Sequence, residues 1–82
     1  MNRKVRFTQS ARKHRVGKAH ALFVMNLYEY QVDPDDSTRF RWLGLDSTNR
    51  ELEVIGINLT DYFLVIHVMP TRRVKNRVLY EE

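Results

Sequence analysis

The chain has 82 residues, of which 43% are apolar, with three glycines, two prolines and a formal net charge of +4. This length allows one domain, residues 1–82, with a modest core, and the composition is typical of a globular protein. The absence of cysteine excludes disulfides, thiol catalysis and cysteine-ligated zinc. No apolar run approaches the roughly 18 residues that cross a bilayer, and the first residues lack the apolar segment of a signal peptide. We therefore expect a cytoplasmic protein with no membrane partner.

The charge is distributed unevenly along the chain. Residues 1–18 hold seven of the 14 basic groups and no acidic group, and residues 72–77 hold four more basic groups. Residues 19–71 hold three basic and eight acidic groups. If the fold brings the two ends together across one side of the sheet, they form a positive face for a polyanion, most plausibly nucleic acid. The alternative is a solvated surface that keeps a small protein soluble.

A short strand and a basic helix are expected at the start. Residues 5–8 alternate apolar and polar side chains, as a strand does. The hydroxyl of Thr8 or Ser10 can accept a hydrogen bond from the first turn of a helix over residues 11–16. Gly17 permits the left-handed conformation that ends such a helix.

A second helix is predicted from residue 18 to about residue 30. Apolar residues recur there at helical spacing, and further apolar residues widen the stripe, so we expect this helix to be largely covered. The residues of the stripe are Ala19, Leu22, Phe23, Leu27 and Tyr30, and the residues that widen it are Ala21, Val24, Met25 and Tyr28.

Three strands with short connections are predicted in the second half. Residues 31–38 form an acidic, turn-forming loop, after which strand-like runs cover 39–45, 51–59 and 62–69. Such short connections predict an antiparallel meander. The last run is apolar on both faces and rich in β-branched residues, which is typical of a central strand buried on both sides. Alternation places the side chains of the 51–59 run on two faces, with Glu51, Glu53, Ile55 and Ile57 on one and Leu52 and Val54 on the other.

Residues 72–82 are predicted to form a short C-terminal helix, with Val74, Val78 and Leu79 as its apolar contacts. The fold class is then α+β, in the order β-α-α-β-β-β-α. An antiparallel four-stranded sheet carries the two N-terminal helices on one face.

The histidines do not predict a metal site, and no cofactor is predicted. His14 and His20 are six residues apart and so lie on different sides of any continuous helix, and no carboxylate cluster completes a ligand set. His67 lies on the central strand beside the basic run and could transfer a proton, or it could be a hydrogen-bonded core histidine. Glu51 or Glu53 could point into the same cleft as Arg72 and serve as a base, or both could be solvated on an exposed sheet face. Aromatic side chains could stack on bases, although their spacings also suit a core; they are Tyr28, Tyr30, Trp42 and Tyr62.

The basic groups are the better candidates for a site. Metal-free RNA cleavage needs a base for the 2′-OH proton, cations for the charge on phosphorus and an acid for the leaving 5′-oxygen. Arginine suits the second role because its planar fork matches phosphate oxygens. The catalytic candidates are His14, His67, Glu53 and Arg72, and the RNA-binding candidates are Arg12, Lys13, Arg15, Arg73, Lys75 and Arg77.

Several stretches resemble BrnT-type toxins, small basic proteins of bacterial toxin–antitoxin pairs. One is residues 7–25, with Ala-Arg-Lys-His-Arg-Val-Gly at 11–17 ahead of an apolar helix. The others are Arg-Trp-Leu-Gly-Leu at 41–45, the hairpin at 46–51, the apolar strand that ends at Met69 and the Arg-rich tail that ends in Tyr-Glu-Glu. The similarity spans nearly the whole chain through short, degenerate motifs.

The resemblance implies a RelE-like fold and a translation-inhibiting ribonuclease that a cognate antitoxin neutralises. Lys13 and His14 match the family's Lys-His pair, and Arg72 or Arg73 matches the arginine after the last strand. The leading hypothesis is therefore a metal-independent, toxin-like endoribonuclease with RNA, possibly on the ribosome, and an antitoxin as its partners. The alternatives are a noncatalytic RNA- or protein-binding module of the same fold and a purely protein-binding subunit.

Overall fold

The structure of the protein is a computed structural model that describes residues 4–71. The predicted C-terminal helix lies outside these residues, as do the four site candidates at its start. The elements of the described part are β1 (Lys4–Phe7), the 3-10 turn η1 (Ser10–Arg12), α1 (Lys18–Leu27), β2 (Gln31–Asp33), β3 (Asp36–Leu45), β4 (Glu51–Asn58) and β5 (Tyr62–Pro70).

The five strands form one mixed sheet in the order β1-β5-β4-β3-β2. Strands β2 to β5 pair antiparallel in succession, as the short turns predict, whereas β1 pairs parallel with β5. The domain is thus α+β, with one α-helix and a five-stranded mixed sheet. The prediction of a four-stranded antiparallel sheet is wrong for two reasons. Strand β1 lies parallel to its neighbour β5, and a further strand, β2, forms within residues 31–38.

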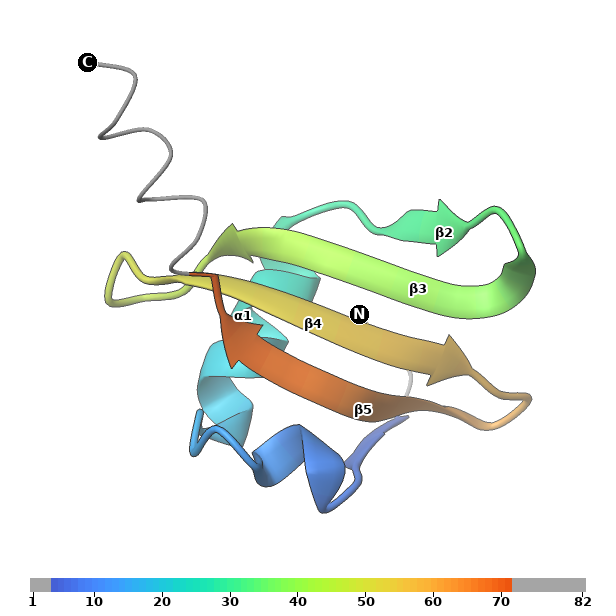
Figure 1. Cartoon of the computed structure of the whole chain (residues 1–82), viewed down its shortest axis with the longest axis horizontal. Coiled ribbons are helices and arrows are strands. Elements are labelled where there is room, and N and C mark those ends of the chain that lie inside the picture. The colour runs from blue at the N-terminus through green and yellow to red at the C-terminus, as the bar shows by residue number, and fades with distance from the viewer. Residues whose placement is uncertain (1–3, 72–82) are drawn as a thin grey trace.

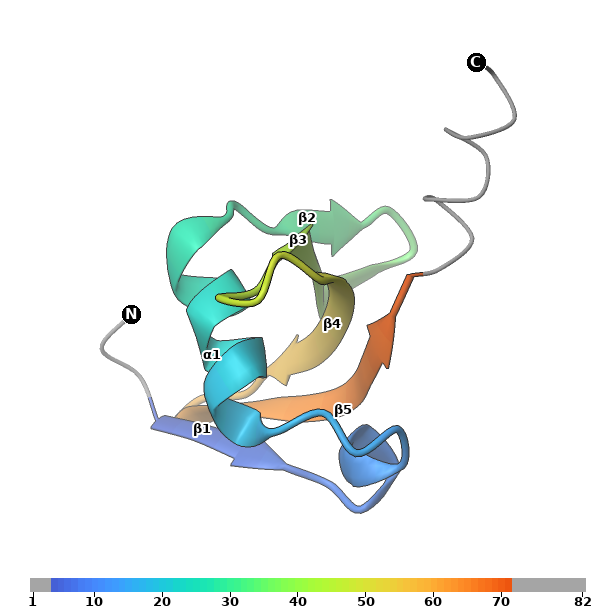
Figure 2. The same ribbon diagram turned by 90° about the vertical axis from the view of Figure 1, so that its left-hand side faces the viewer.

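One face of the sheet carries the core. Helix α1 packs over this face, which lies behind the strands in Figure 1 and at the left of the sheet in Figure 2. The side chains that point towards α1 are the buried ones, because burying apolar surface drives the packing of the two layers. The largest fully buried side chains are Trp42, Leu52, Val24, Val54, Val65 and Val68.

The other face, which we call the open face, is turned towards the viewer in Figure 1, and within residues 4–71 no helix covers it. Strand β4 shows the difference: Leu52 and Val54 have no exposed surface, whereas Ile55 and Ile57 are half-buried. The predicted alternation of this strand is confirmed.

Two predictions about the N-terminal half are wrong. Residues 11–16 contain only the single turn η1 instead of a helix, although the Thr8 hydroxyl does accept from the Ala11 N–H at 3.2 Å, as predicted. Gly17 is extended, with φ −64° and ψ 149°, and precedes α1 as its N-cap. The left-handed residue is Arg15, at φ 60°. The Arg15 N–H already bonds to the Arg12 carbonyl, so the chain turns back there before a second helical turn can form.

Helix α1 is also shorter and less covered than predicted. It ends at Leu27, and its buried side chains are Ala21, Val24 and Met25, which form an i, i+3, i+4 set displaced from the predicted stripe. Phe23 and Leu27 belong to that stripe, yet they are 37% and 65% exposed. A helix that contacts a single layer can cover only one side of itself, so the apolar residues on its outer side stay in water.

The acidic loop is a hairpin. Residues 31–33 form β2 at the edge of the sheet, and β3 begins at Asp36 instead of residue 39. The side chain of Asp33 accepts from the Asp35 N–H at 2.8 Å, and that of Asp36 accepts from the Thr38 N–H at 3.0 Å. These Asx turns supply the reversal that the sequence indicates, and the flanking residues extend into strands.

Strand β5 lies inside the sheet between β1 and β4, but it is not buried on both sides. Phe63, Val65 and Val68 point into the core, whereas Leu64 and Met69 on the open face are half-buried. The spacing of the buried residues changes after Val65 because the register with β4 shifts there. The apolar character of both faces therefore reflects a two-layer fold with a partly apolar open face, and not a second covering layer.

Candidate functional site

A histidine pair forms where the N-terminal segment meets β5. Strand β1 pairs with only the first half of β5, ending at the Phe7–Val65 partners, and the Thr8 N–H then bonds to the Val65 carbonyl at 3.0 Å. From there the chain runs through η1 along the second half of β5, as both views of the ribbon show (Figures 1 and 2). The rings of His14 and His67 consequently lie edge to face, with centroids 6.3 Å apart.

Two buried anchors hold the segment that presents His14. Ala11 and Val16 are 1% and 7% exposed, whereas His14 between them is exposed. The turn bonds of η1 and the left-handed Arg15 fold the intervening residues into a compact loop. His14 is therefore held beside β5 by the core contacts of its neighbours and by its ring contact with His67.

The position of His67 depends on the register shift in β5. Ile55 pairs with His67 and Gly56 with Val65, so Ile66 is an extra residue on β5. Without this bulge, simple alternation from Val65 would place His67 on the core face. The extra residue instead turns the imidazole to the open face, next to β4.

Glu53 on β4 joins His67 to Arg41 on β3. Its Oε1 lies 3.1 Å from His67 Nε2, and its Oε2 accepts from Arg41 Nε at 2.6 Å. Burial raises the pKa of the Glu53 carboxyl, but the hydrogen bond and charge of Arg41, together with His67, outweigh burial and hold it below its ordinary value. Glu53 is thus an ionised acceptor between two donors.

This arrangement fixes the protons of His67. An ionised carboxylate can only accept hydrogen bonds, so His67 Nε2 carries a proton and donates to Glu53. In the neutral ring Nδ1 is then the acceptor and can take up a proton. The site accordingly contains one oriented imidazole, one exposed imidazole and an ionised carboxylate.

The described residues bring together three of the four predicted catalytic residues, namely His14, His67 and Glu53. The fourth, Arg72, lies outside residues 4–71, as do Arg73, Lys75 and Arg77. The predicted RNA-binding residues Arg12, Lys13 and Arg15 are all exposed on the loop that carries His14.

Other candidates serve the fold. Glu51 accepts a hydrogen bond from the Thr71 hydroxyl, which ties the end of β5 to β4. Trp42 is 1% exposed and belongs to the core, and the Tyr30 ring stacks on Phe40 with centroids 4.1 Å apart. The Tyr62 ring is on the open face, and the Cζ atom of the Arg6 guanidinium lies 5.0 Å from the ring centroid. Each of these aromatic rings already has a partner within the chain.

Sequence reasoning missed Arg41. The register places Arg41 opposite Ile55, which is two residues from Glu53 on the same face of β4, so the ion pair runs diagonally across β3 and β4. The available signal was the alternation of Arg39 and Arg41 with apolar residues, which puts both cations on the face of Glu53 once the turn at 46–50 fixes the register.

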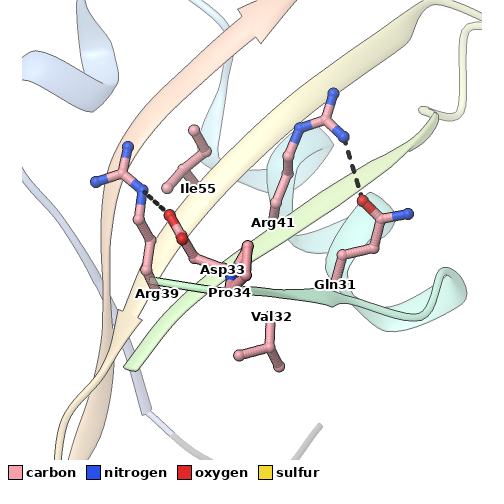
Figure 3. A pocket seen from close by; sticks show the side chains of 7 residues that line it. All are labelled: Gln31, Val32, Asp33, Pro34, Arg39, Arg41 and Ile55. Carbon is pink, nitrogen blue, oxygen red and sulfur yellow. Dashed lines mark hydrogen bonds and ion pairs between the residues drawn. The ribbon is translucent and has the colours of Figure 1, made fainter. Parts of the chain in front are cut away.

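A hollow lies on the open face near β2, the edge strand of the sheet, and Figure 3 shows it from close by. Its volume is about 220 Å³, and the Arg39 and Arg41 side chains rise from neighbouring positions of β3 with Ile55 between them. Arg39 Nε lies 3.7 Å from Asp33 Oδ2, and Arg41 Nη1 donates to Gln31 at 3.4 Å. The remaining lining residues are Val32 and Pro34.

A second polar cluster, at the turn between β3 and β4, is structural. Asp46 is 4% exposed, and its Oδ1 accepts from the Thr48 N–H, the Thr48 hydroxyl and the Arg50 N–H at 2.9, 2.7 and 3.0 Å. Burial raises its pKa, but these hydrogen bonds and that of the Arg50 side chain hold it far below the ordinary range. His20 Nδ1 lies 3.2 Å from Asp46 Oδ2 without being aimed at it as a hydrogen bond. The cluster fixes the turn and places it beside His20 of α1.

Residues 4–71 contain no group of three histidines or carboxylates placed to hold a metal ion. The helix of this part of the chain is too short to cross a membrane. No protein-family model, no curated protein and no solved structure matches the chain.

Proposed function

We propose that the protein is a toxin-like endoribonuclease of a type II toxin–antitoxin pair, which inhibits translation in the cytoplasm by cleaving RNA without a metal ion. The observation that carries this proposal is the meeting of His14 and His67, 53 residues apart in the sequence, with ring centroids 6.3 Å apart beside an ionised carboxylate. A pair of imidazoles is the simplest set of groups that can remove one proton and supply another. The resemblance to BrnT-type toxins and its implied RelE-like fold point to the same activity.

In the proposed reaction His67 is the base. Its Nδ1 removes the proton of a ribose 2′-OH, and the 2′-oxygen attacks the neighbouring phosphorus. Protonated His14 then donates a proton to the departing 5′-oxygen, which leaves as a hydroxyl. The products are a 2′,3′-cyclic phosphate and a 5′-OH end, and no oxidant, reductant or water is consumed. Glu53 positions the His67 ring and stabilises the imidazolium that forms.

The cations supply the remaining requirement. Negative charge grows on the phosphoryl oxygens during attack, and fixed cations that face them lower the barrier. Lys13, next to His14, is the described residue best placed for this role, with Arg12 and Arg15 binding the flanking phosphates. By resemblance, Arg72 joins Lys13 at the reacting phosphate, and Arg73, Lys75 and Arg77 extend the RNA-binding surface.

The test is cleavage of a messenger-length RNA by the purified protein in excess EDTA, with the product ends determined. We expect 2′,3′-cyclic phosphate ends and a rate that falls about 100-fold or more in His67→Ala and in His14→Ala. His20→Ala is the matched control, because His20 lies beside Asp46 and should retain the rate. Thermal melts of all variants show whether each is folded. If the RNA stays intact with the folded wild-type protein, both with and without ribosomes, the proposed enzymatic activity is refuted.

A noncatalytic RNA-binding module is the second candidate, and one observation favours it. Glu53 already accepts hydrogen bonds from the Nε2–H of His67 and the Nε–H of Arg41. A carboxylate paired in this way is also typical of a purely structural polar network. In that case the exposed cations around His14 bind RNA without cleaving it. Binding that weakens steeply with salt, together with intact RNA, is the result expected for this function.

A further inference from the structure

We propose that the open face of the sheet is the docking surface for an acidic, amphipathic helical segment of a protein partner. The segment would place an aliphatic side chain in the hollow between Arg39 and Arg41 and its carboxylates on the arginines around it. This inference rests on the proposed function for the existence of a cognate partner, and it adds the surface and the chemistry by which that partner regulates the site.

The strand register builds an apolar floor with cations on both sides. Arg6 on β1 is paired with Leu64 on β5, Leu64 with Ile57 on β4, and Ile57 with Arg39 on β3. Partners in register point to the same face of a sheet. A row therefore runs from arginine across two aliphatic side chains to a second arginine. The next row on this face has His67, Ile55 and Arg41 in register, so that one aliphatic side chain lies between a histidine and an arginine.

The hollow gives this floor a point of attachment. It has room for one aliphatic side chain above Ile55, with the stems of Arg39 and Arg41 as walls (Figure 3). The central contacts of protein interfaces are typically side chains that fill small pockets, and arginine is enriched among them. A leucine or isoleucine in this hollow removes apolar surface from water on both partners.

On the β3 side of the open face, the positive groups are more exposed than the negative groups that pair with them. The side chains of Arg39 and Arg41 are each 41% exposed, whereas those of Asp33 and Glu53 are 34% and 19% exposed. A guanidinium has five N–H donors. Among residues 4–71, Arg41 donates one to Glu53 and one to Gln31, and Arg39 approaches Asp33 at 3.7 Å through Nε. Donors of both arginines remain for carboxylates of a partner.

The composition of the floor favours a protein over RNA. Single-stranded RNA is held by aromatic rings on which its bases stack. The floor residues are aliphatic, and Tyr62, the aromatic residue at its β1 end, is already covered by the Arg6 guanidinium. A partner with an aliphatic stripe and acidic flanks matches both the floor and its rim.

An acidic partner on the open face would also lie over Glu53 and His67, which face the same way. Docking there excludes RNA from the histidine pair, which is a direct means of inhibition.

The experiment uses the full chain and designed peptides as probes. One 14-residue peptide carries leucine at helical i, i+3, i+4 and i+7 positions with glutamate around them, a second scrambles the same residues, and a third replaces glutamate with lysine. Affinities are measured by fluorescence anisotropy, and the contact surface is mapped from backbone amide shifts in NMR spectra. We expect binding of the first peptide alone, with the largest shifts at Arg39, Ile55 and Ile57.

Variants test the two components of the surface. Arg39→Glu should lower the affinity for the glutamate peptide about tenfold and create binding of the lysine peptide, because the charge of the rim is reversed. Ile57→Thr keeps a β-branched side chain on the strand and should lower the affinity for the glutamate peptide through loss of apolar contact. Lys18→Glu makes the same charge change as Arg39→Glu but on α1, in the other layer, and should leave both peptide affinities unchanged.

Each outcome has a defined meaning. Equal binding of the ordered and scrambled peptides, or an equal effect of Lys18→Glu and Arg39→Glu, would overturn the proposal by showing nonspecific charge attraction. A uridine 12-mer that gives the open-face shifts when the glutamate peptide does not would replace the protein partner with RNA. RNA cleavage without peptide binding would remove this inference and leave the proposed function intact. Peptide binding without RNA cleavage would support the docking surface and remove the proposed endoribonuclease activity.

Discussion

The two faces of this sheet follow different rules although they are built from the same strands. On the core face, Leu52, Val54 and Trp42 have almost no exposed surface and contact α1 and one another. On the open face, the alternating positions of the same strands carry an ion pair, a histidine and half-buried aliphatic side chains. The core face holds the fold together, and the open face is free to carry a site.

This difference explains why a small domain can hold several charges without losing its fold. A two-layer protein needs only one apolar face, so the other tolerates polar residues as long as each has a partner or water. Glu53 meets that condition with two donors. Substitutions on the two faces should accordingly be separable, with stability lost on one and function on the other.

The largest expected effect is a leucine truncation on the core face. Leu52→Ala leaves a cavity where the side chain has no exposed surface and should lower the free energy of unfolding by about 2–5 kcal/mol. Leu64→Ala removes the same atoms from the half-buried open face and should cost about 1 kcal/mol, because less surface leaves water there. Urea unfolding followed by circular dichroism measures both. Equal losses would mean that the open face is covered as thoroughly as the core.

Removal of the buried charge at Asp46 should come next. Asp46→Asn loses a charged acceptor of four hydrogen bonds and should lower the free energy of unfolding by about 1–3 kcal/mol at pH 7. The pKa of Asp46 is lowered by folding, so its stabilising contribution is complete above the ordinary pKa and is lost as the pH falls.

The sign of this effect is checked by unfolding curves from pH 7 to pH 2. Wild-type stability should decline below about pH 4, the ordinary range of an aspartate, and the curve of Asp46→Asn should be flatter. Asp36→Asn is the control, because the Asp36 carboxyl also has a lowered pKa, through its bonds to Thr38, but is fully exposed. A flatter curve for Asp36→Asn than for Asp46→Asn would contradict the assignment.

Gly44 offers a smaller perturbation at the contact between the layers. It is buried on the core face of β3, and a Cβ there would overlap the ring of Tyr28 at the end of α1. Gly44→Ala must displace that ring and should lower the free energy of unfolding by about 1–2 kcal/mol, although alanine favours a strand more than glycine does. Gly56→Ala is the matched control, because its Cβ would meet Trp42 at an ordinary 3.4 Å. Thermal melts should rank Gly44→Ala below Gly56→Ala.

The sequence predicted the strands well because their signals are local. Runs of strand-forming residues located β1, β4 and most of β3 and β5, and the turn at 46–50 located the antiparallel pairing of β3 and β4. The helical half was predicted less well because it depends on packing. Nothing local distinguishes the buried Val24 from the exposed Phe23, since both are apolar and they are adjacent in the sequence. The choice between them is made by the sheet on which α1 lies.

The site was predicted in part for the same reason. Chemical type alone selected His14, His67 and Glu53, and the structure brings these residues together. Arg41 was missed because its pairing with Glu53 requires the register of two strands. The orientation of His67 also required the bulge at Ile66, which an alternation pattern by itself does not place. Pairings across strands are the information that a single sequence conveys least.

The smallest expected effect on stability, and the most informative about the open face, is that of Glu53→Gln. Its ion pair with Arg41 is partly exposed to water, so the free energy of unfolding at pH 7 should change by about 1 kcal/mol or less. Folding lowers the pKa of Glu53, so this contribution is present above the ordinary glutamate pKa and disappears as the pH falls below it. The amide keeps one acceptor oxygen but loses the charge that stabilises an imidazolium at His67, and RNA cleavage should therefore fall while the fold persists. Glu51→Gln is the control, because Glu51 bonds to Thr71 instead of the histidine pair. A Glu53→Gln protein that unfolds as readily as Leu52→Ala would show that the polar network belongs to the scaffold, and the separation between the two faces would fail.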